Sequence, residues 1–472
     1  MADFDLAVIG AGAAGLSVTA VAAQLGLRVA LIERDRMGGD CLNTGCVPSK
    51  ALLAASHAVR AGLRAERFGV RFAAPEIDWE AVQAHVNGVI DAIAPMDSAA
   101  RFEALGAVVI AGEARFVGRD ALMVGDRRIT ANRIVIAAGS RATVPPIPGL
   151  AEVPFLTNAT LFAPGPKPAH LLILGGGPIG LEMAQAHAGL GVRVTIVEAQ
   201  TIAGRDDPEL VDGLRRVLRD DGVDIIEGVP VVEVEAGPVL VLADGRRIAG
   251  DRLLVAVGRT PNLDELDLES GGVQTSRLGV VTDSGLRSIS NKRVFVVGDI
   301  ADPVGVGPRA FTHVASYHAG IAIRRAVFRL PAKLDYRALP RVTYTTPELA
   351  QVGMTEAEAR AAGAHDIRIL RWPLADNDRA QAERETVGLV KLVVGRRGRI
   401  LGAGILAPHA GEMIGTWTLA ISQGIKLGAL AGMIVPYPTR AEAGKRAAGT
   451  YYLSWLLGRW TKRIVGWLAK LP

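Results

Sequence analysis

Leu6-Ala7-Val8-Ile9-Gly10-Ala11-Gly12-Ala13-Ala14-Gly15 is an apolar run that ends in the glycine pattern G-x-G-x-x-G. A strand that leads through this pattern into a helix is typical of a dinucleotide-binding unit. The glycines permit a tight turn and let a pyrophosphate approach the helix N-terminus. Glu33 ends the next apolar strand, 23 residues after Gly10. A carboxylate at this place hydrogen-bonds a ribose hydroxyl, so the segment predicts one nucleotide site.

The same pattern occurs again at Leu171-Leu-Ile-Leu-Gly175-Gly-Gly177-Pro-Ile-Gly180, and Glu198 follows 23 residues after Gly175. One G-x-G-x-x-G is weak evidence, but two sets with strand, helix and acid in register are strong. The chain is therefore predicted to bind two dinucleotides. Two further apolar strands lead into Gly139 and Gly258, and each is expected to close one nucleotide domain.

Cys41 and Cys46 are the only cysteines, and they lie just after the first fingerprint in Gly38-Gly-Asp-Cys-Leu-Asn-Thr-Gly-Cys-Val-Pro-Ser-Lys50. Two cysteines in 472 residues exclude a structural disulfide framework. A pair that opens a probable helix suggests a redox dithiol, because a helix N-terminus lowers thiol pKa and the thiolate is the form that exchanges. The alternative is two buried, inert cysteines. The flanking glycines, Pro48 and Lys50 favour the redox dithiol.

The length of 472 residues predicts about three domains, and the composition, 49% hydrophobic and 21% charged, allows large cores. The formal net charge is +5, but no acid follows Glu442 and six bases do, so residues 1–442 carry −1. The excess positive charge therefore lies in the C-terminal segment after Glu442. For this reason we expect no nucleic-acid binding. The first residues carry no basic run, which predicts no signal peptide and a cytoplasmic location.

These motifs resemble those of the flavin-dependent pyridine nucleotide–disulfide oxidoreductases (class I), which include glutathione reductase, dihydrolipoamide dehydrogenase and mercuric reductase. Val294-Phe-Val-Val-Gly298-Asp299 is similar to the second flavin motif of that family, and Thr345–Gly353 and Ala410–Ile414 are similar to its dimerisation domain. The resemblance covers nearly the whole chain. It implies an α/β fold with two Rossmann-type three-layer dinucleotide-binding domains plus a C-terminal α+β dimerisation domain. The expected domains are 1–150 with 268–335 for FAD, 151–267 for NAD(P), and 336–472 for dimerisation.

By this resemblance the first fingerprint binds FAD and the second binds NAD(P)H. Cys46 would face the flavin, Cys41 would be the interchange thiol, and Lys50 and Glu182 would pair beside the flavin. Electrons would pass from the nicotinamide through the flavin to the Cys41–Cys46 disulfide. The expected FAD-binding residues are Gly10, Gly12, Gly15, Glu33, Gly39, Thr44, Gly139 and Asp299. The expected NAD(P)-binding residues are Gly175, Gly177, Gly180, Glu198 and Gly258.

Glu198 favours NADH, because a carboxylate there repels the 2′-phosphate of NADPH. Arg205 lies seven residues further on and could offset this repulsion, so NADPH stays an alternative. A similarly placed arginine precedes Glu-Asp-Pro in mercuric reductases, and here Arg205 precedes Asp206-Asp-Pro208. The other interpretation of Arg205 is a solvated loop charge.

One motif departs from the pattern of the family members that act on thiols and disulfides. Those proteins carry His-Pro-x-x-x-Glu near the C-terminus, supplied by the partner subunit, and this chain has Tyr437-Pro-Thr-Arg-Ala-Glu442. A phenol titrates near pH 10 and is a poor proton shuttle at neutral pH, which argues against lipoamide or glutathione as the substrate. Tyrosine at this place is similar to mercuric reductases, as is Arg371–Ala380. Mercuric reductases also end in a vicinal cysteine pair, whereas no cysteine follows Cys46 here.

The leading hypothesis is an FAD-dependent NAD(P)H oxidoreductase that passes electrons through the dithiol to a thiol-bound metal ion or a small electrophile. The alternatives are dihydrolipoamide dehydrogenase-like disulfide exchange and a membrane-docked redox sensor or electron-transfer subunit. We expect a homodimer in which Tyr437 and Glu442 complete the partner's site, and a small-molecule acceptor. His313 and His318 are expected to pack near the flavin domain, and no permanent metal site is expected.

Leu453–Leu471 is predicted to be a basic, tryptophan-rich amphipathic helix. Its apolar residues fall at helical spacing, and its bases lie opposite or beside them. Such a helix is typical of peripheral contact with a membrane, here at the inner face. The alternative is that its apolar side docks on the protein's own dimerisation domain.

Overall fold

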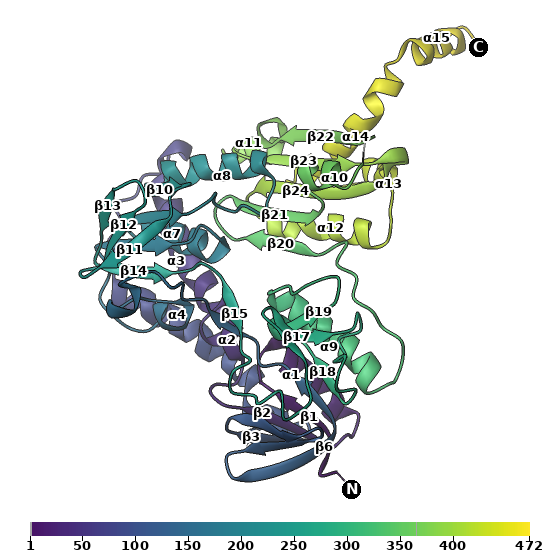
Figure 1. The fold of residues 1–472 in the computed structure, drawn as a ribbon. Helices are drawn as coiled ribbons and strands as arrows, with labels where there is room; N and C mark the ends of the chain where they lie inside the picture. Colours follow the sequence, from purple (N-terminus) through teal and green to yellow (C-terminus); the bar gives the residue numbers. More distant parts are fainter. Residues whose placement is uncertain (1, 365) are drawn as a thin grey trace. The chain divides into compact units, whose positions relative to one another are not determined.

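The computed structural model describes residues 2–364 and 366–472 and shows two compact units of mixed α/β structure (Figure 1). Unit 1 comprises the chain up to Leu174 together with Val232–Val241 and Arg247–Leu334. Unit 2 comprises Gly175–Val231, Leu242–Arg246 and Asp335–Pro472. The mixed architecture agrees with the predicted α/β class.

The centre of unit 1 is a parallel sheet in the strand order β3-β2-β1-β6, with β18 on the other side of β6. Leu6 of β1 aligns with Val29 of β2 and with Arg133 of β6. An antiparallel extension of β4 and β5 pairs with the first half of β6. The strands are β1 (Phe4–Ile9), β2 (Val29–Glu33), β3 (Ala107–Ala111), β4 (Ala114–Gly118), β5 (Ala121–Val124), β6 (Arg127–Ile136) and β18 (Val294–Val296).

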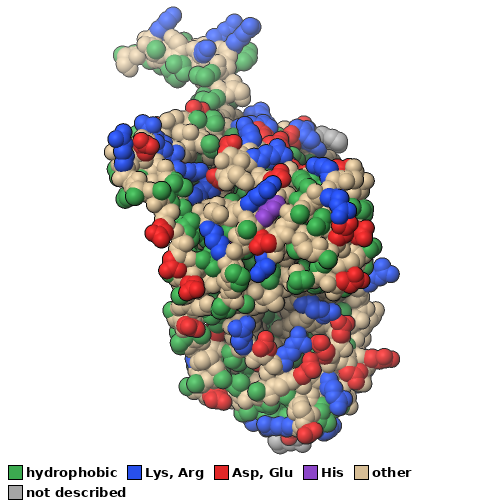
Figure 2. Space-filling model, turned by 90° about the vertical axis from the view of Figure 1, so that its left-hand side faces the viewer, with side chains coloured by type: hydrophobic (Ala, Val, Ile, Leu, Met, Phe, Trp, Pro, Cys, Tyr) green, Lys and Arg blue, Asp and Glu red, His purple; other side chains and the backbone are tan. Residues whose placement is uncertain are grey.

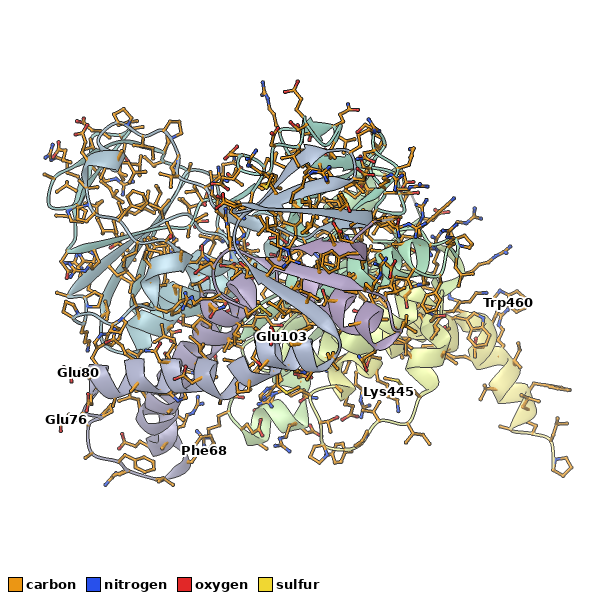
Figure 3. The ribbon with its side chains drawn as sticks, turned by 90° about the horizontal axis from the view of Figure 1, so that it is seen from below. Phe68, Glu76, Glu80, Glu103, Lys445 and Trp460 are labelled. Carbon is orange, nitrogen blue, oxygen red and sulfur yellow. The ribbon has the colours of Figure 1, made fainter. Side chains whose placement is uncertain are left out.

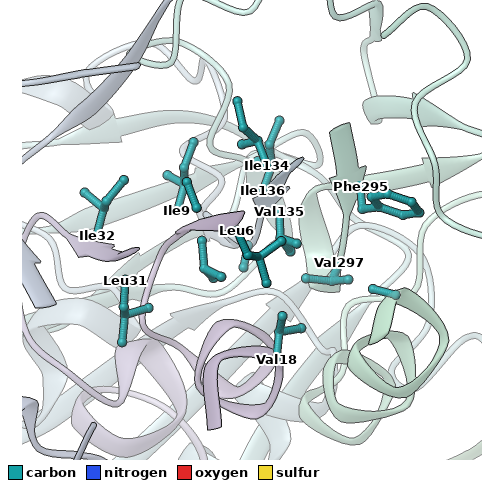
Figure 4. Close-up of a cluster of buried hydrophobic side chains, with 14 of the residues drawn as sticks. Leu6, Ile9, Val18, Leu31, Ile32, Ile134, Val135, Ile136, Phe295 and Val297 are labelled. Carbon is teal, nitrogen blue, oxygen red and sulfur yellow. The ribbon is translucent and has the colours of Figure 1, made fainter. Parts of the chain in front are cut away.

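The core of unit 1 forms because its parallel strands are apolar on both faces. Helices α1 (Ala13–Gln24) and α9 (Thr312–Ala326) pack against each other and close the core on one side. Removing this apolar surface from water is the main source of stability of the unit. Figure 4 shows part of the cluster, with Leu6, Ile9, Val18, Leu31, Ile32, Ile134, Val135, Ile136, Phe295 and Val297 labelled.

The other helices of unit 1 are α2 (Gly39–Asn43), α3 (Cys46–Arg64), α4 (Trp79–Ile93), α5 (Ala99–Ala104) and α6 (Asn158–Leu161). Strand β8 pairs in parallel with β14, and β7 pairs antiparallel with β15. The remaining strands, which lie wholly or mostly in unit 1, are β7 (Ser140–Ala142), β8 (His170–Leu174), β11 (Val231–Glu235), β12 (Val239–Leu242), β13 (Arg247–Ala249), β14 (Arg252–Val255), β15 (Arg259–Pro261), β16 (Thr275–Ser276), β17 (Gly279–Thr282) and β19 (Ala301–Pro303).

Unit 2 contains a parallel pair of strands and an antiparallel sheet. The pair is β9 (Arg193–Glu198) with β10 (Val223–Glu227), accompanied by α7 (Pro178–Gly189) and α8 (Pro208–Asp220). The antiparallel sheet has the order β20-β21-β24-β23-β22. Its strands are β20 (Pro340–Thr343), β21 (Glu348–Gly353), β22 (Arg368–Pro373), β23 (Leu389–Val394) and β24 (Ile400–Ala407). The remaining helices are α10 (Glu356–Ala361), α11 (Asp378–Ala382), α12 (Ala410–Ser422), α13 (Leu427–Gly432), α14 (Glu442–Leu456) and α15 (Arg459–Leu468).

The prediction of one continuous C-terminal helix over Leu453–Leu471 was wrong. Helix α14 ends at Leu456, and α15 begins at Arg459 after Gly458, whose backbone is extended with φ −67° and ψ 157°. A glycine stabilises a helix poorly, and here it caps the new helix instead of continuing the old one.

A buried lysine joins α8 to the antiparallel sheet of unit 2. Lys391 on β23 places its Nζ 2.9 Å from carboxylate oxygens of Asp207 and of Glu209, and 3.1 Å from Glu356. Burial lowers the pKa of Lys391, but the hydrogen bonds to the three carboxylates outweigh it and the pKa is raised. The ammonium group therefore stays charged and supplies the counter-charge for the buried carboxylate of Asp207, while Glu209 and Glu356 also pair with Arg371 and Arg360.

Replacing this lysine should destabilise the protein strongly. In Lys391→Met the side-chain volume is kept, but Asp207 loses its counter-ion, which costs about 3–5 kcal/mol when a buried pair is broken. Chemical denaturation should show this loss in the free energy of unfolding. The exposed Lys333→Met is the matched control and should change it by less than about 0.5 kcal/mol. Equal, small effects of both variants would show that the buried cluster does not stabilise unit 2.

Candidate functional site

The first fingerprint forms a tight loop between β1 and α1. A Cβ atom added to Gly15 would lie 1.8 Å from the carbonyl oxygen of Gly10, so only glycine lets the helix pack this closely on the strand. At Gly12 an added Cβ would meet nothing nearer than 3.9 Å, and the α1 N-terminus there carries no acid in its first turn. This open space beside a helix N-terminus fits a pyrophosphate.

The two predicted ribose-binding acids take the same place in their loops. Glu33 Oε2 accepts a hydrogen bond from the backbone N–H of Ala11 at 2.6 Å. Glu198 Oε2 accepts one from the backbone N–H of Gly176 at 2.7 Å, and its Oε1 accepts one from Gln200 at 2.9 Å. Each acid therefore lies against the middle residue of its G-x-G turn, where a ribose of a bound nucleotide is expected.

The second loop, in unit 2, also leaves room for a phosphate. A Cβ added to Gly177 would meet no atom within 4 Å, whereas one at Gly176 would lie 2.7 Å from Ile202. Gly180 is buried within α7. The side chain of Arg205 is exposed, and its backbone carbonyl accepts a hydrogen bond from Arg341.

The dithiol segment begins directly on the first fingerprint loop. The backbone N–H of Gly38 donates to the carbonyl of Ala11 at 2.9 Å. Gly39 has a φ of +59°, and a Cβ there would lie 2.7 Å from the Cα of Gly12. Helix α2, which carries Cys41, therefore starts in backbone contact with the predicted phosphate loop.

The structure brings the two cysteines together. Cys41 lies in α2 and is half-buried, while Cys46 is exposed and is the first residue of α3. A hydrogen bond with Cys46 and burial raise the pKa of the Cys41 thiol. The sulfur of Cys46 lies 3.3 Å from the hydroxyl of Thr312 on α9. The predicted opening of a helix by the dithiol is present, because α3 extends from Cys46 to Arg64.

Asp40 holds the segment between the cysteines in place. Its carboxylate accepts hydrogen bonds from the Thr44 hydroxyl at 2.5 Å and from the Asn158 amide at 2.7 Å. The guanidinium of Arg259 contacts the other carboxylate oxygen at 2.8 Å. The hydroxyl of Thr44, a residue expected to bind the flavin, donates a hydrogen bond to Asp40 in this structure.

Arg259 also connects this segment to Asp299, in the segment that resembles a second flavin motif. Its Nε donates to the Ser140 hydroxyl at 2.7 Å, and Ser140 donates to Asp299 at 2.6 Å. Burial raises the pKa of Asp299, opposed by the Ser140 hydrogen bond and the charge of Arg259. Sequence reasoning missed Ser140 and Arg259. Their position could have indicated them, because Ser140 directly follows Gly139 and Arg259 directly follows Gly258, and both glycines were predicted to close a nucleotide domain.

His318 supports the second flavin motif from α9. Its Nδ1 accepts a hydrogen bond from the backbone N–H of Gly298 at 3.1 Å. Burial lowers the pKa of His318 to about 4, so the ring is neutral and able to accept this bond at neutral pH. His313 stacks on Phe311 with ring centroids 5.1 Å apart. Both histidines therefore lie on α9 in unit 1, and their place near a flavin stays a prediction.

Lys50 and Glu182 lie in different units. Lys50 is on α3 in unit 1, and Glu182 is buried on α7 in unit 2, where its Oε1 accepts from the backbone N–H of Tyr344 at 2.9 Å. Their pairing beside the flavin stays a prediction.

The loop around Tyr437 is held by the other segment that resembles mercuric reductases. The Tyr437 hydroxyl donates to Asp378 at 2.7 Å, and the Asn377 amide donates to the carbonyl of Thr439 at 3.0 Å. The hydrogen bond to Asp378 and its charge raise the pKa of Tyr437, whose side chain is 67% exposed. Glu442, the other predicted residue of the loop, forms an ion pair with Arg446.

Comparison with known proteins identifies the class. The family described as pyridine nucleotide-disulphide oxidoreductase matches residues 4–354, and the dimerisation domain of the same family matches residues 339–448. The chain therefore belongs to the pyridine nucleotide-disulphide oxidoreductases, which use FAD together with NAD(P)H. The predicted family and fold class are confirmed, and the dimerisation domain supports the predicted homodimer.

Several individual relatives are similar over most of their length. A mercuric reductase of Streptomyces lividans is 38% identical over 466 residues, covering 95% of this chain and 96% of that protein. A dihydrolipoyl dehydrogenase of Geobacillus stearothermophilus is 34% identical over 465 residues, covering 94% of this chain and 96% of that protein. The solved Cu(II) complex of the HOCl-induced flavoprotein disulfide reductase RclA from Escherichia coli has a TM-score of 0.85. It is 29% identical and covers 95% of this chain and 100% of that one.

Two kinds of feature are absent from the described part of the chain. No cluster of three or more histidine, cysteine or acidic side chains able to hold a metal ion is present among the described residues, and His365 lies outside them. Within residues 2–364 and 366–472, no helix has the length and apolar character needed to cross a bilayer.

Removing the Asp378 carboxylate should lower the pKa of Tyr437. In Asp378→Ala the phenol loses both the hydrogen bond and the negative charge that oppose its ionisation. Ultraviolet titration, with Tyr437→Phe subtracted to isolate this phenol from the other tyrosines, should show ionisation at lower pH than in the wild type. Asp376→Ala, an exposed acid two residues away, is the control and should leave the titration unchanged. An unchanged pKa in Asp378→Ala would mean that the pair does not persist in solution.

Proposed function

We propose that the chain is an FAD-dependent NAD(P)H oxidoreductase whose Cys41–Cys46 pair passes electrons to a thiol-bound metal ion or to a small electrophile. The observation that carries this proposal is the hydrogen bond from Tyr437 to Asp378. A phenol with a raised pKa keeps its proton at neutral pH, so it does not take the proton of a substrate thiol. Thiol–disulfide exchange needs such a base, whereas reduction of a metal ion does not.

The residues of unit 1 fit this role. When bound, FAD accepts two electrons from NAD(P)H and transfers them to the disulfide. The chain holds the dithiol segment through Asp40 and Arg259, and the hydrogen bond with Cys46 and burial raise the pKa of the Cys41 thiol. The second thiol lies at the positive end of α3, where a negatively charged sulfur is favoured. In the homodimer, Tyr437 of the partner subunit would complete the site.

Soft metal ions suit a pair of cysteine sulfurs as ligands. One NAD(P)H supplies two electrons, which reduce one Hg(II) to elemental mercury or two Cu(II) to two Cu(I), and NAD(P)⁺ and a proton are released. Mercuric reductases are among the relatives, and the related RclA has been solved as a Cu(II) complex. Both observations support a metal ion as the acceptor.

We propose NADH as the preferred donor. Both carboxylate oxygens of Glu198 accept backbone hydrogen bonds, which fixes a negative charge where a ribose would bind. The 2′-phosphate of NADPH would face this charge. The side chain of Arg205 is exposed to solvent, and NADPH stays the alternative donor.

Removing the charge of Glu198 should weaken the preference for NADH. In Glu198→Ala the ratio of kcat/KM for NADH to that for NADPH should fall by roughly tenfold, because about 1.4 kcal/mol of differential binding corresponds to that factor. Steady-state kinetics with both nucleotides measures the ratio. Glu227→Ala, an acid at the end of the neighbouring strand β10, is the control for a general loss of charge. A wild-type enzyme that prefers NADPH would contradict the assignment.

The choice of acceptor should respond to the residue at position 437. Anaerobic NADH oxidation with Hg(II) in excess small thiol, or with Cu(II) in the absence of added thiol, should be fast and should be lost in Cys41→Ser. Lipoamide should be reduced slowly, and Tyr437→His should raise lipoamide turnover by roughly tenfold or more, since a positioned base contributes about 10²–10⁴-fold.

The opposite pattern would favour the dihydrolipoamide dehydrogenase-like alternative. Fast lipoamide turnover by the wild type, unchanged in Tyr437→Phe, would mean that the proton is handled by another group. Slow turnover with every small acceptor would favour the electron-transfer or sensor alternative.

A further inference from the structure

The C-terminal segment Leu453–Pro472, here called the tail, is exposed along almost its whole length. The first half of α14 packs on β22, β23 and α13 and buries Ala443, Gly444, Ala447 and Ala448. From Leu453 onward every residue is exposed except Gly458 and Thr461, which are half-buried. Figure 1 shows α15 beyond the end of α14, away from the antiparallel sheet of unit 2.

The exposed side of the tail is strongly apolar. Trp455, Trp460 and Trp467 are 70%, 75% and 63% exposed. On α15, Trp460, Ile464, Trp467 and Leu468 follow at spacings of four, three and one, which places them on one face of the helix. Leaving so many large apolar side chains in water is unfavourable, so this face marks a contact surface. Figure 3 labels Trp460 on α15 and Lys445 at the start of α14.

The opposite side of the tail is basic. Arg459, Lys462 and Arg463 share a face of α15, and Lys470 follows its end. Arg463 also places its guanidinium 5.7 Å from the ring centre of Trp460, so the charge borders the apolar face. No acidic residue follows Glu442. Figure 2 shows hydrophobic and basic side chains gathered on the tail.

Helix α15 is long enough to lie on a membrane surface but too short to cross a bilayer. Its ten residues are about 15 Å long, while the hydrocarbon core of a bilayer is about 30 Å thick. An apolar face with tryptophans and a cationic polar face is the pattern of a helix that lies in the interface of a membrane.

The positive charge of the tail favours a lipid surface over a second copy of the chain as its binding partner. Residues 1–442 carry a formal charge of only −1, so a second copy presents little net negative charge to a segment with six bases and no acid. A bilayer with anionic headgroups presents a dense negative surface, and each base near it adds to the affinity. We infer that the tail binds the surface of an anionic membrane, with Trp460 and Trp467 in the headgroup region and Lys462 and Arg463 against the lipid charges. This inference does not depend on which acceptor the dithiol serves.

Flotation of the full-length, FAD-loaded protein with vesicles tests the inference. We expect binding to vesicles of phosphatidylcholine mixed with phosphatidylglycerol, little binding to phosphatidylcholine alone, and weaker binding at high salt. Lys462→Glu with Arg463→Glu should lower the apparent partition constant by roughly tenfold or more. Trp460→Ala with Trp467→Ala should also lower it. Arg277→Glu with Lys333→Glu makes the same charge change at exposed positions of unit 1 and should alter binding by less than about twofold.

Other outcomes would overturn the inference. Equal binding to both kinds of vesicle would show that the bases do not recognise lipid charge, and an equal loss in the control pair would show a non-specific charge effect. Failure to bind either vesicle, together with a smaller sedimentation coefficient in the tryptophan variant, would show that the tail docks on a second copy. NADH-dependent reduction of the flavin should be unchanged in all these variants, which separates this test from the proposed acceptor.

Discussion

The contact between the backbones at Gly12 and Gly39 is the constraint on which the site depends. A Cβ at Gly39 would lie 2.7 Å from the Cα of Gly12, and the adjacent Gly38 donates to Ala11 at 2.9 Å. Any side chain at Gly39 would push α2 off the loop predicted to hold the flavin pyrophosphate, and Cys41 would move with it. The first fingerprint and the dithiol are close in sequence, and this contact holds them at a fixed position relative to each other.

Hydrogen bonds and an ion pair then hold the dithiol segment in the position that this backbone contact sets. Asp40 sits one turn before Thr44 and ties the segment between the thiols to Asn158 and Arg259. Arg259 also reaches Ser140, and through it Asp299, which is predicted to bind the flavin. Because these groups are partly buried, each one left without a partner would cost about 1–3 kcal/mol, so the network favours one arrangement of the dithiol.

The residues whose role comes from local sequence could be predicted, and those whose role comes from long-range contact could not. The fingerprints, their acids and the dithiol follow from glycine spacing and helix position, and they lie where strand and turn geometry requires. Arg259 and Asp378 act on partners 219 and 59 residues away, and no local pattern reports such contacts. The break of the C-terminal helix at Gly458 was missed because the apolar periodicity continues across it, although glycine was the available signal.

We propose that the cysteine pair exchanges electrons with the flavin that the adjacent loop would hold. Anaerobic titration of the FAD-loaded protein with dithionite, followed by the visible absorption of the flavin, tests it most directly. We predict uptake of about four electron equivalents per flavin by the wild type and about two by Cys46→Ser, because flavin and disulfide each accept two. Uptake of about two by both proteins would contradict it and would leave the two cysteines without a redox role.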